Sequence, residues 1–131
     1  MNGLRQVLVE TSAWIETFRP MGDPGIRAAV SAVASEGRAV LCEPVLLELW
    51  NGAQGEREKK LIQELETVLP RVAASGAVWA TAKELARRCR QAGLSLPAYD
   101  LLIAACARVH QLDILHRDAH FDQLAVLVPE T

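Results

Sequence analysis

The sequence lacks the long apolar stretches that carry a chain into or across a membrane. Arg5 and Gln6 interrupt the N-terminal region, which therefore does not have the apolar core of a secretory signal peptide. No apolar run approaches the roughly 20 residues that a transmembrane helix requires. We therefore expect a cytoplasmic protein without a membrane partner.

Cysteine is scarce, and its spacing argues against a soft-metal site or a disulfide framework. The three cysteines, Cys42, Cys89 and Cys106, form no CxxC pair, and each stands among apolar neighbours. A zinc site needs closer ligand spacing with histidines nearby. We expect three free, buried thiols in a reducing compartment.

Repeats, linkers and low-complexity segments are also absent, and 131 residues suit one domain spanning residues 1–131. Half of the chain (50%) is hydrophobic and 23% is charged, as in globular proteins. The formal net charge of −2 argues against a protein that coats nucleic acid nonspecifically, because such proteins are usually basic. An enzyme that meets RNA at one local patch remains compatible with this charge.

Short apolar runs alternate with segments of helical periodicity, which predicts an α/β fold. The expected helices lie at residues 13–18, 24–37, 43–52, 56–69, 78–93 and from 97 onward, the last apolar on every side and therefore buried. The expected strands lie at residues 7–9, 39–41, 113–115 and 125–128. Uniformly apolar strands are typical of a sheet covered on both faces. We predict a three-layer α/β/α sandwich around a short, mostly parallel sheet.

Four acids stand where a simple core would not place them. Glu10 directly follows the first strand, and Asp118 comes shortly after the strand that ends at Leu115, so both are expected at the carboxyl edge of the sheet. Asp100 lies in the first turn of the buried helix, and Glu48 lies between leucines in the helix after the second strand. Buried carboxylates need a partner or a cation. Hard oxygen ligands suit Mg²⁺ or Mn²⁺, which can activate water for phosphodiester hydrolysis.

Each acid also has an ordinary structural explanation. Asp100 could complement a helix dipole, Asp118 could cap a helix, Glu10 could be exposed, and Glu48 could pair with an arginine. We favour a shared site for the four together, because three of them interrupt strongly apolar surroundings.

Four motifs contain the acids, in the order VLVETSAWIETF (7–18), LLELWNGA (46–53), PAYDLLIAACA (97–107) and LHRDAHFDQL (115–124). Together they resemble the motifs of the PIN-domain family, whose short stand-alone members are mostly VapC-type toxin ribonucleases. Their order, their spacing and the chain length match the family, and the resemblance covers nearly the whole chain. It implies a PIN-like fold, cleavage of single-stranded RNA (tRNA, rRNA or mRNA) by a metal-activated water, a small antitoxin protein as partner, and a homodimer.

Carried over by position, the resemblance assigns roles to individual residues. The acidic cluster that binds Mg²⁺ or Mn²⁺ would consist of Glu10, Glu48, Asp100 and Asp118, with Glu10 and Asp100 as central ligands. Thr11 or Ser12 would orient the first carboxylate or a metal-bound water, and Asp122 would be an auxiliary acid. Apart from the resemblance, Arg117 and His120 flank Asp118 and are candidate phosphate contacts, and His116 could contact the substrate or could equally be an ordinary residue at a strand end.

The first acid departs from the family pattern, because Glu10 stands where the family usually has Asp. The additional methylene moves the carboxylate by roughly 1–1.5 Å, on the scale of one bond. This shift could retune the site, favour Mn²⁺ or weaken activity. A catalytically weakened PIN domain that binds an antitoxin or RNA is therefore the main alternative. Another Mg²⁺-dependent phosphoryl hydrolase ranks below it, since the sequence has no phosphate-cradling Gly-rich loop and no DxD motif.

The aromatic residues and one further histidine allow smaller predictions. Trp79 is expected in the core, whereas Trp14 and Trp50 could serve an interface or a pocket because they follow Glu10 and Glu48 closely. His110 is expected to cap the end of the buried helix.

Overall fold

The structure, a computed structural model, describes residues 5–130 and contains one sheet of four parallel strands. The strands are β1 (Val7–Val9), β2 (Ala39–Cys42), β3 (Arg71–Val72) and β4 (Asp113–Leu115), arranged in the order β3-β2-β1-β4. Every pairing between them is parallel. The prediction of an α/β fold with a mostly parallel sheet is confirmed, and within the described residues the sheet is parallel throughout.

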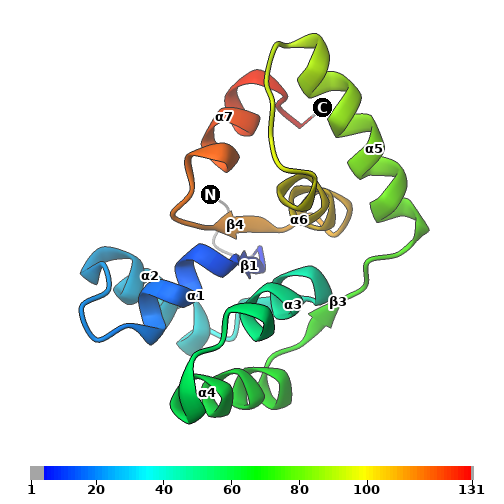
Figure 1. Ribbon diagram of the computed structural model, residues 1–131. Helices are drawn as coiled ribbons and strands as arrows, with labels where there is room; N and C mark the ends of the chain where they lie inside the picture. The colour runs from blue at the N-terminus through cyan, green and yellow to red at the C-terminus, as the bar shows by residue number, and fades with distance from the viewer. Residues whose placement is uncertain (1–4, 131) are drawn as a thin grey trace.

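In the described part of the chain, seven helices cover the two faces of this sheet. They are α1 (Thr11–Phe18), α2 (Pro24–Ser35), α3 (Glu43–Gly52), α4 (Gly55–Val68), α5 (Gly76–Gln91), α6 (Ala98–Val109) and α7 (Ala119–Leu127). Figure 1 shows α5, α6 and α7 on one side of the strands and α1 to α4 on the other. This is the predicted three-layer arrangement.

The core follows from this double coverage. β1 and β2 are buried along their whole length, and α6 is buried from Asp100 to Ala107 because it packs between the sheet and α5. The three cysteines are free and buried, as predicted. Among the helices of residues 5–130, none has the length and apolarity needed to cross a bilayer.

The register of the central strand fixes the position of the site. Val7 lies opposite Ala39 of β2 and Asp113 of β4, so the three strands end at the same edge of the sheet. Beyond β1, the backbone N–H of Glu10 donates to the carbonyl of Leu115 at 2.9 Å. The residues that follow these strands therefore gather at one edge.

The strand predicted at residues 125–128 is wrong, because α7 continues to Leu127. Phe121, Leu124 and Val128 are buried, whereas Val126 and Leu127 are exposed. Burial at positions i, i+3 and i+7 is helical spacing, and it overrides the local preference of a short apolar run for a strand.

Two further features differ from the sequence prediction. β3 is missed because it has only two residues, neither fully buried, at the edge of the sheet. Trp79 is 51% exposed instead of lying in the core. The buried stripe of α5 runs through Val78, Leu85 and Cys89, and Trp79 lies one position away from it.

The other small predictions concern single side chains. Trp14 is buried and stacks on Phe18 with ring centroids 6.3 Å apart, while Trp50 lies at the surface with 36% exposure. His110 is the C-cap residue of α6, as predicted, and its ring bonds to the carbonyl of Ala73 at 2.8 Å.

Candidate metal centre

Glu10 occupies the position between β1 and α1 and caps the helix. Its backbone is extended, and its Oε1 accepts hydrogen bonds from the backbone N–H of Ser12 at 2.9 Å and from the Ser12 hydroxyl. The side chain also meets the positive end of the α1 dipole. Glu10 is only 4% exposed, so its carboxylate is held in one place beneath the surface.

Glu48 reaches the same place from the middle of α3. The hydroxyl of Thr11 donates a hydrogen bond to Glu48 Oε1 at 2.5 Å. Thr11 and Ser12, adjacent in the first turn of α1, therefore contact two different carboxylates. This division of roles depends on tertiary structure, and the sequence alone did not specify it.

Asp100, Asp118 and His120 form the other half of the cluster. Asp118 caps α7, and its Oδ1 accepts a hydrogen bond from the backbone N–H of His120 at 2.9 Å. The ring Nδ1 of His120 lies 2.7 Å from Asp100 Oδ2 and 3.4 Å from Asp118 Oδ1. One potential ligand atom from each of these three residues lies within 4.8 Å of the others.

The charges of neighbouring acids act on both Glu10 and Glu48. Burial raises the pKa of Glu10 above its ordinary value, and the charges of Glu48 and Asp118 add to this rise, while the hydrogen bonds from Ser12 oppose it. Burial likewise raises the pKa of Glu48, with further increases from the charges of Asp100 and Asp118 and an opposing effect of the Thr11 bond. Carboxylates that repel one another in this way are stabilised by a shared cation.

Each of the four carboxylates is held by the protein through a single oxygen. The bonded atoms are Oε1 of Glu10, Oε1 of Glu48, Oδ2 of Asp100 and Oδ1 of Asp118. Within residues 5–130, no hydrogen bond or ion pair falls on the second oxygen of any of them, and neither lysine nor arginine bonds to the group. A set of oriented carboxylate oxygens to which neither lysine nor arginine bonds has the chemistry that hard divalent cations require.

The other predicted site residues surround the loop between β4 and α7. The Nδ1 atom of His116 accepts a hydrogen bond from the backbone N–H of Asp118 at 3.1 Å, its Nε2 lies 3.5 Å from Asp122 Oδ1, and its ring packs on Phe121. Asp122 therefore contacts His116, and no bond joins it to the four carboxylates.

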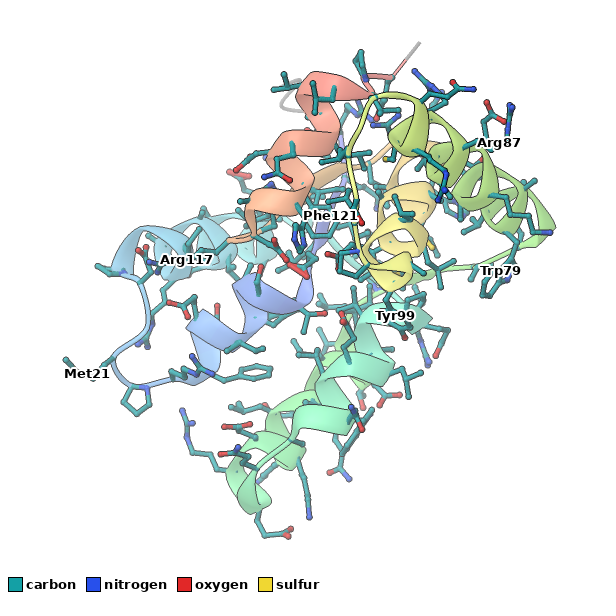
Figure 2. The ribbon with its side chains drawn as sticks, turned by 45° about the horizontal axis from the view of Figure 1, so that its top comes forward. Met21, Trp79, Arg87, Tyr99, Arg117 and Phe121 are labelled. Carbon is teal, nitrogen blue, oxygen red and sulfur yellow. The ribbon has the colours of Figure 1, made fainter. Side chains whose placement is uncertain are left out.

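Arg117 links the same loop to α1 and to the turn that follows it. Its backbone N–H donates to the Ser12 hydroxyl oxygen at 2.8 Å, while its guanidinium pairs with Glu16 and Asp23, both at 2.9 Å. Figure 2 shows Arg117 on the side of the molecule where α1 and α2 lie. No sequence motif identified Glu16 and Asp23 as its partners.

Tyr99 is another residue that sequence reasoning missed. Its hydroxyl donates to the carbonyl of Pro44 at 2.8 Å and so ties the start of α6 to the start of α3 (Figure 2). Burial raises the pKa of Tyr99, and the charge of Glu48 adds to the rise. The sequence signal that could have identified Tyr99 was its position directly before Asp100. A side chain at the start of α6 can determine how closely α6 packs against α3.

The molecule also has an apolar groove, which none of the four acids lines. It is lined by residues of α3, α4, α5 and α6 and has a volume of about 550 Å³. Leu47, Trp50 and Trp79 contribute exposed apolar surface to it, with Leu47 62% exposed. Figure 2 shows Trp79 at the outer end of α5, away from the centre of the molecule.

Comparison with known proteins gives matches over almost the whole chain. The PIN domain profile matches residues 7–127. VapC ribonuclease Mb1587 of Mycobacterium bovis and ribonuclease VapC11 of Mycobacterium tuberculosis are each 35% identical to this chain over 124 residues, which cover 91% of this chain and 91% of theirs.

Solved structures share the fold at lower sequence identity. FitAcB from Neisseria gonorrhoeae superposes with a TM-score of 0.76 at 22% identity, over 93% of this chain and 94% of its own. DNA-bound VapBC from Salmonella typhimurium has a TM-score of 0.75 at 18% identity, over 91% and 92%. VapC20 from Mycobacterium tuberculosis, described as a Sarcin-Ricin loop cleaving toxin, has a TM-score of 0.71 at 21% identity, over 95% and 98%.

Proposed function

Because this chain belongs to the PIN-domain family, we propose that it is a metal-dependent endoribonuclease that acts as the toxin of a toxin–antitoxin pair. The relatives that are 35% identical over 91% of the chain are named as ribonucleases. The observation that carries the proposal is the gathering of ligand atoms from Asp100, Asp118 and His120 within 4.8 Å of one another, with the charges of Glu10 and Glu48 acting on the same group of acids. A passive binding surface gains nothing from such a costly set of charges.

The proposed cofactor is Mg²⁺ or Mn²⁺, held by the four carboxylates with Glu10 and Asp100 as central ligands. The supporting observation is that, within the described residues, hydrogen bonds orient these carboxylates and neither lysine nor arginine bonds to them. When bound, a divalent ion supplies positive charge for the phosphate oxygens and lowers the pKa of water. Ser12 and Thr11 keep the carboxylates of Glu10 and Glu48 in place, so the ligands need little rearrangement.

The proposed substrate is a single-stranded segment of tRNA, rRNA or mRNA, contacted by residues of the loop between β4 and α7. Glu16 and Asp23 hold the Arg117 side chain, which limits the directions from which a phosphate can approach it. His116 is buttressed by Phe121 and Asp122, consistent with an auxiliary role for Asp122 in fixing that ring. His120 lies nearest the acids, at 2.7 Å from Asp100.

A cognate antitoxin, a second copy of the chain and a cytoplasmic location complete the proposal. An apolar groove of about 390 Å³ between α1, α2 and α4 is lined by Trp14, Phe18 and Leu65 and suits an apolar segment of an antitoxin. The exposed apolar surface of Leu47 and Trp79 beside the other groove suits a homodimer contact.

The decisive experiment is a calorimetric titration of Mn²⁺ into the metal-free protein, followed by incubation with structured RNAs. We expect saturable binding and endonucleolytic cleavage by the wild type, and loss of both in Asp100→Asn. Glu84→Gln, which removes an acid on the outer face of α5, is the matched control and should retain both. A wild type that binds no divalent ion and cleaves no RNA would sink the proposal.

Glu10 stands where the family usually has Asp, and this difference supports a second candidate function. In that function, the protein is a PIN domain that binds an antitoxin or RNA without cutting RNA. Growth arrest after expression distinguishes the two functions. Arrest that disappears in Asp100→Asn supports the nuclease, whereas arrest that persists in this variant supports the binding module.

A further inference from the structure

The ring of His120 lies at the acidic cluster in the manner of a fifth ligand. Its Nδ1 is 2.7 Å from Asp100 Oδ2 and 3.4 Å from Asp118 Oδ1, although these acids belong to different helices. Its backbone N–H is bonded to Asp118, which fixes the position of the residue at the start of α7. The imidazole is therefore directed at the acids by the helix cap that contains it.

The distances fit a shared cation. Adjacent ligands around an octahedral ion with bonds of about 2.1 Å lie about 3.0 Å apart, since they subtend a right angle. The separations of 2.7 and 3.4 Å between Nδ1 and the two carboxylate oxygens bracket this value. One potential ligand atom from each of Asp100, Asp118 and His120 lies within 4.8 Å of the others, so the three residues can share a single ion.

We propose that Nδ1 of His120 is a metal ligand and that it makes this site prefer Mn²⁺ to Mg²⁺. The inference rests on the proposed function, in which the acidic cluster holds a divalent ion. Mg²⁺ binds oxygen ligands almost exclusively, whereas imidazole nitrogen favours transition metals. A nitrogen ligand at this position therefore raises the affinity for Mn²⁺ relative to Mg²⁺, compared with a site made of oxygens alone.

The same contact has two simpler interpretations, which make different predictions. If His120 only pairs with Asp100, or only contacts RNA, its removal changes the affinity for Mn²⁺ and Mg²⁺ by the same factor. If His120 is a ligand, its removal weakens Mn²⁺ binding more than Mg²⁺ binding. In the wild type, the electron spin of bound Mn²⁺ then couples to the ¹⁴N nucleus of the ligating nitrogen.

Two measurements on the protein test the proposal without relying on activity. The first is pulsed electron paramagnetic resonance of wild type loaded with Mn²⁺, where we expect a coupling to ¹⁴N that is lost in His120→Ala. The second is calorimetry with Mn²⁺ and with Mg²⁺. We expect the variant to lose roughly 10- to 100-fold in Mn²⁺ affinity and much less in Mg²⁺ affinity.

His110→Ala is the control, because that ring bonds to the carbonyl of Ala73 and should affect neither ion. Bound Mn²⁺ without nitrogen coupling in the wild type, or equal loss of both ions in His120→Ala, overturns the role of His120 and leaves the proposed nuclease intact. A wild type that binds neither ion overturns the metal centre and the role of His120 together.

Discussion

The hydroxyl of Thr11 donates a 2.5 Å hydrogen bond to Glu48, 37 residues away along the chain, and thereby joins the first turn of α1 to the middle of α3. Ser12, the next residue, holds Glu10 instead. Two consecutive hydroxyls thus set the separation of two carboxylates that the sequence leaves far apart. The first prediction follows from this pair.

Thr11→Val keeps the shape of the side chain but removes the donor to Glu48. Because this bond opposes the rise in the pKa of Glu48, its loss should raise that pKa further and free the carboxylate to rotate. We expect Mn²⁺ affinity to fall by about 10-fold, as is typical when an outer partner of a ligand is removed. Calorimetry measures the change. Thr11→Ser retains a hydroxyl and should bind nearly as the wild type does, so equal affinities of the Val and Ser variants would contradict this role.

Glu10→Gln should make the metal-free protein more stable at neutral pH. Burial raises the pKa of Glu10 from 4.5, so the folded state holds its proton more tightly than the unfolded state does. The favourable contribution of this group is complete below pH 4.5 and is lost as the pH rises through the folded-state pKa. The Gln variant, which cannot ionise, should therefore gain stability over the wild type as the pH rises above 4.5 and then keep a constant advantage.

Urea unfolding of both proteins between pH 4 and pH 8 checks this. Glu56→Gln is a suitable control, because the Glu56 side chain is 93% exposed. A Glu10→Gln advantage that grows toward acid pH would contradict the predicted sign.

Removal of the metal should lower the stability of the wild type at neutral pH. A ligand that binds only the folded state at 100 times its Kd stabilises that state by about 2.7 kcal/mol. Thermal unfolding with saturating Mn²⁺ and after chelation measures the difference. The Asp100→Asn variant should have the same unfolding temperature with Mn²⁺ and after chelation. If Mn²⁺ raised its unfolding temperature as much as that of the wild type, the ion would bind elsewhere.

Gly22→Ala should destabilise the turn that positions Arg117. A Cβ at Gly22 would lie 1.8 Å from the carbonyl oxygen of Glu16, so the backbone would have to move. Glu16 also accepts a hydrogen bond from the guanidinium of Arg117. We expect a loss of about 1–3 kcal/mol in the free energy of unfolding. Gly52→Ala, where nothing lies within 4 Å of an added Cβ, should be neutral or stabilising by up to about 1 kcal/mol. Similar losses in both variants would show that the turn tolerates the displacement.

The sheet and the positions of two acids followed directly from the sequence. Val7–Val9 and Asp113–Leu115 are strands as predicted, because uniformly apolar runs of that length suit a sheet covered on both faces. Parallel strands place their carboxyl ends together, so Glu10 and Asp118 were expected near one edge. The structure brings Glu48 and Asp100 to the same place, while their catalytic and metal-binding roles remain proposals.

Details that depend on packing between distant segments were not accessible in this way. The second half of α7 was predicted as a strand. Four consecutive apolar residues show neither the periodicity of a helix nor that of a strand, so the sequence could not distinguish the two. Val78 and Trp79 are adjacent in α5, so the rotation of this helix about its axis decides which of them faces the core. That rotation depends on how α5 packs against distant segments. The approach of His120 to Asp100 joins α7 to α6, and the only signal in the sequence was its spacing of two residues from Asp118.

The parallel sheet has a consequence for the synthesis of the protein. β1 is the central strand and pairs with β4, so the first acid of the cluster, Glu10, is near the start of the chain while the last, Asp118, is near its end. During translation the complete cluster cannot form until residues up to about Asp118 have left the ribosome, and pairing across such a sequence separation is slow. A nascent chain that ends before Asp118 therefore lacks the assembled site, and the emergence of Asp118, not that of Glu10, sets the time at which the site can form.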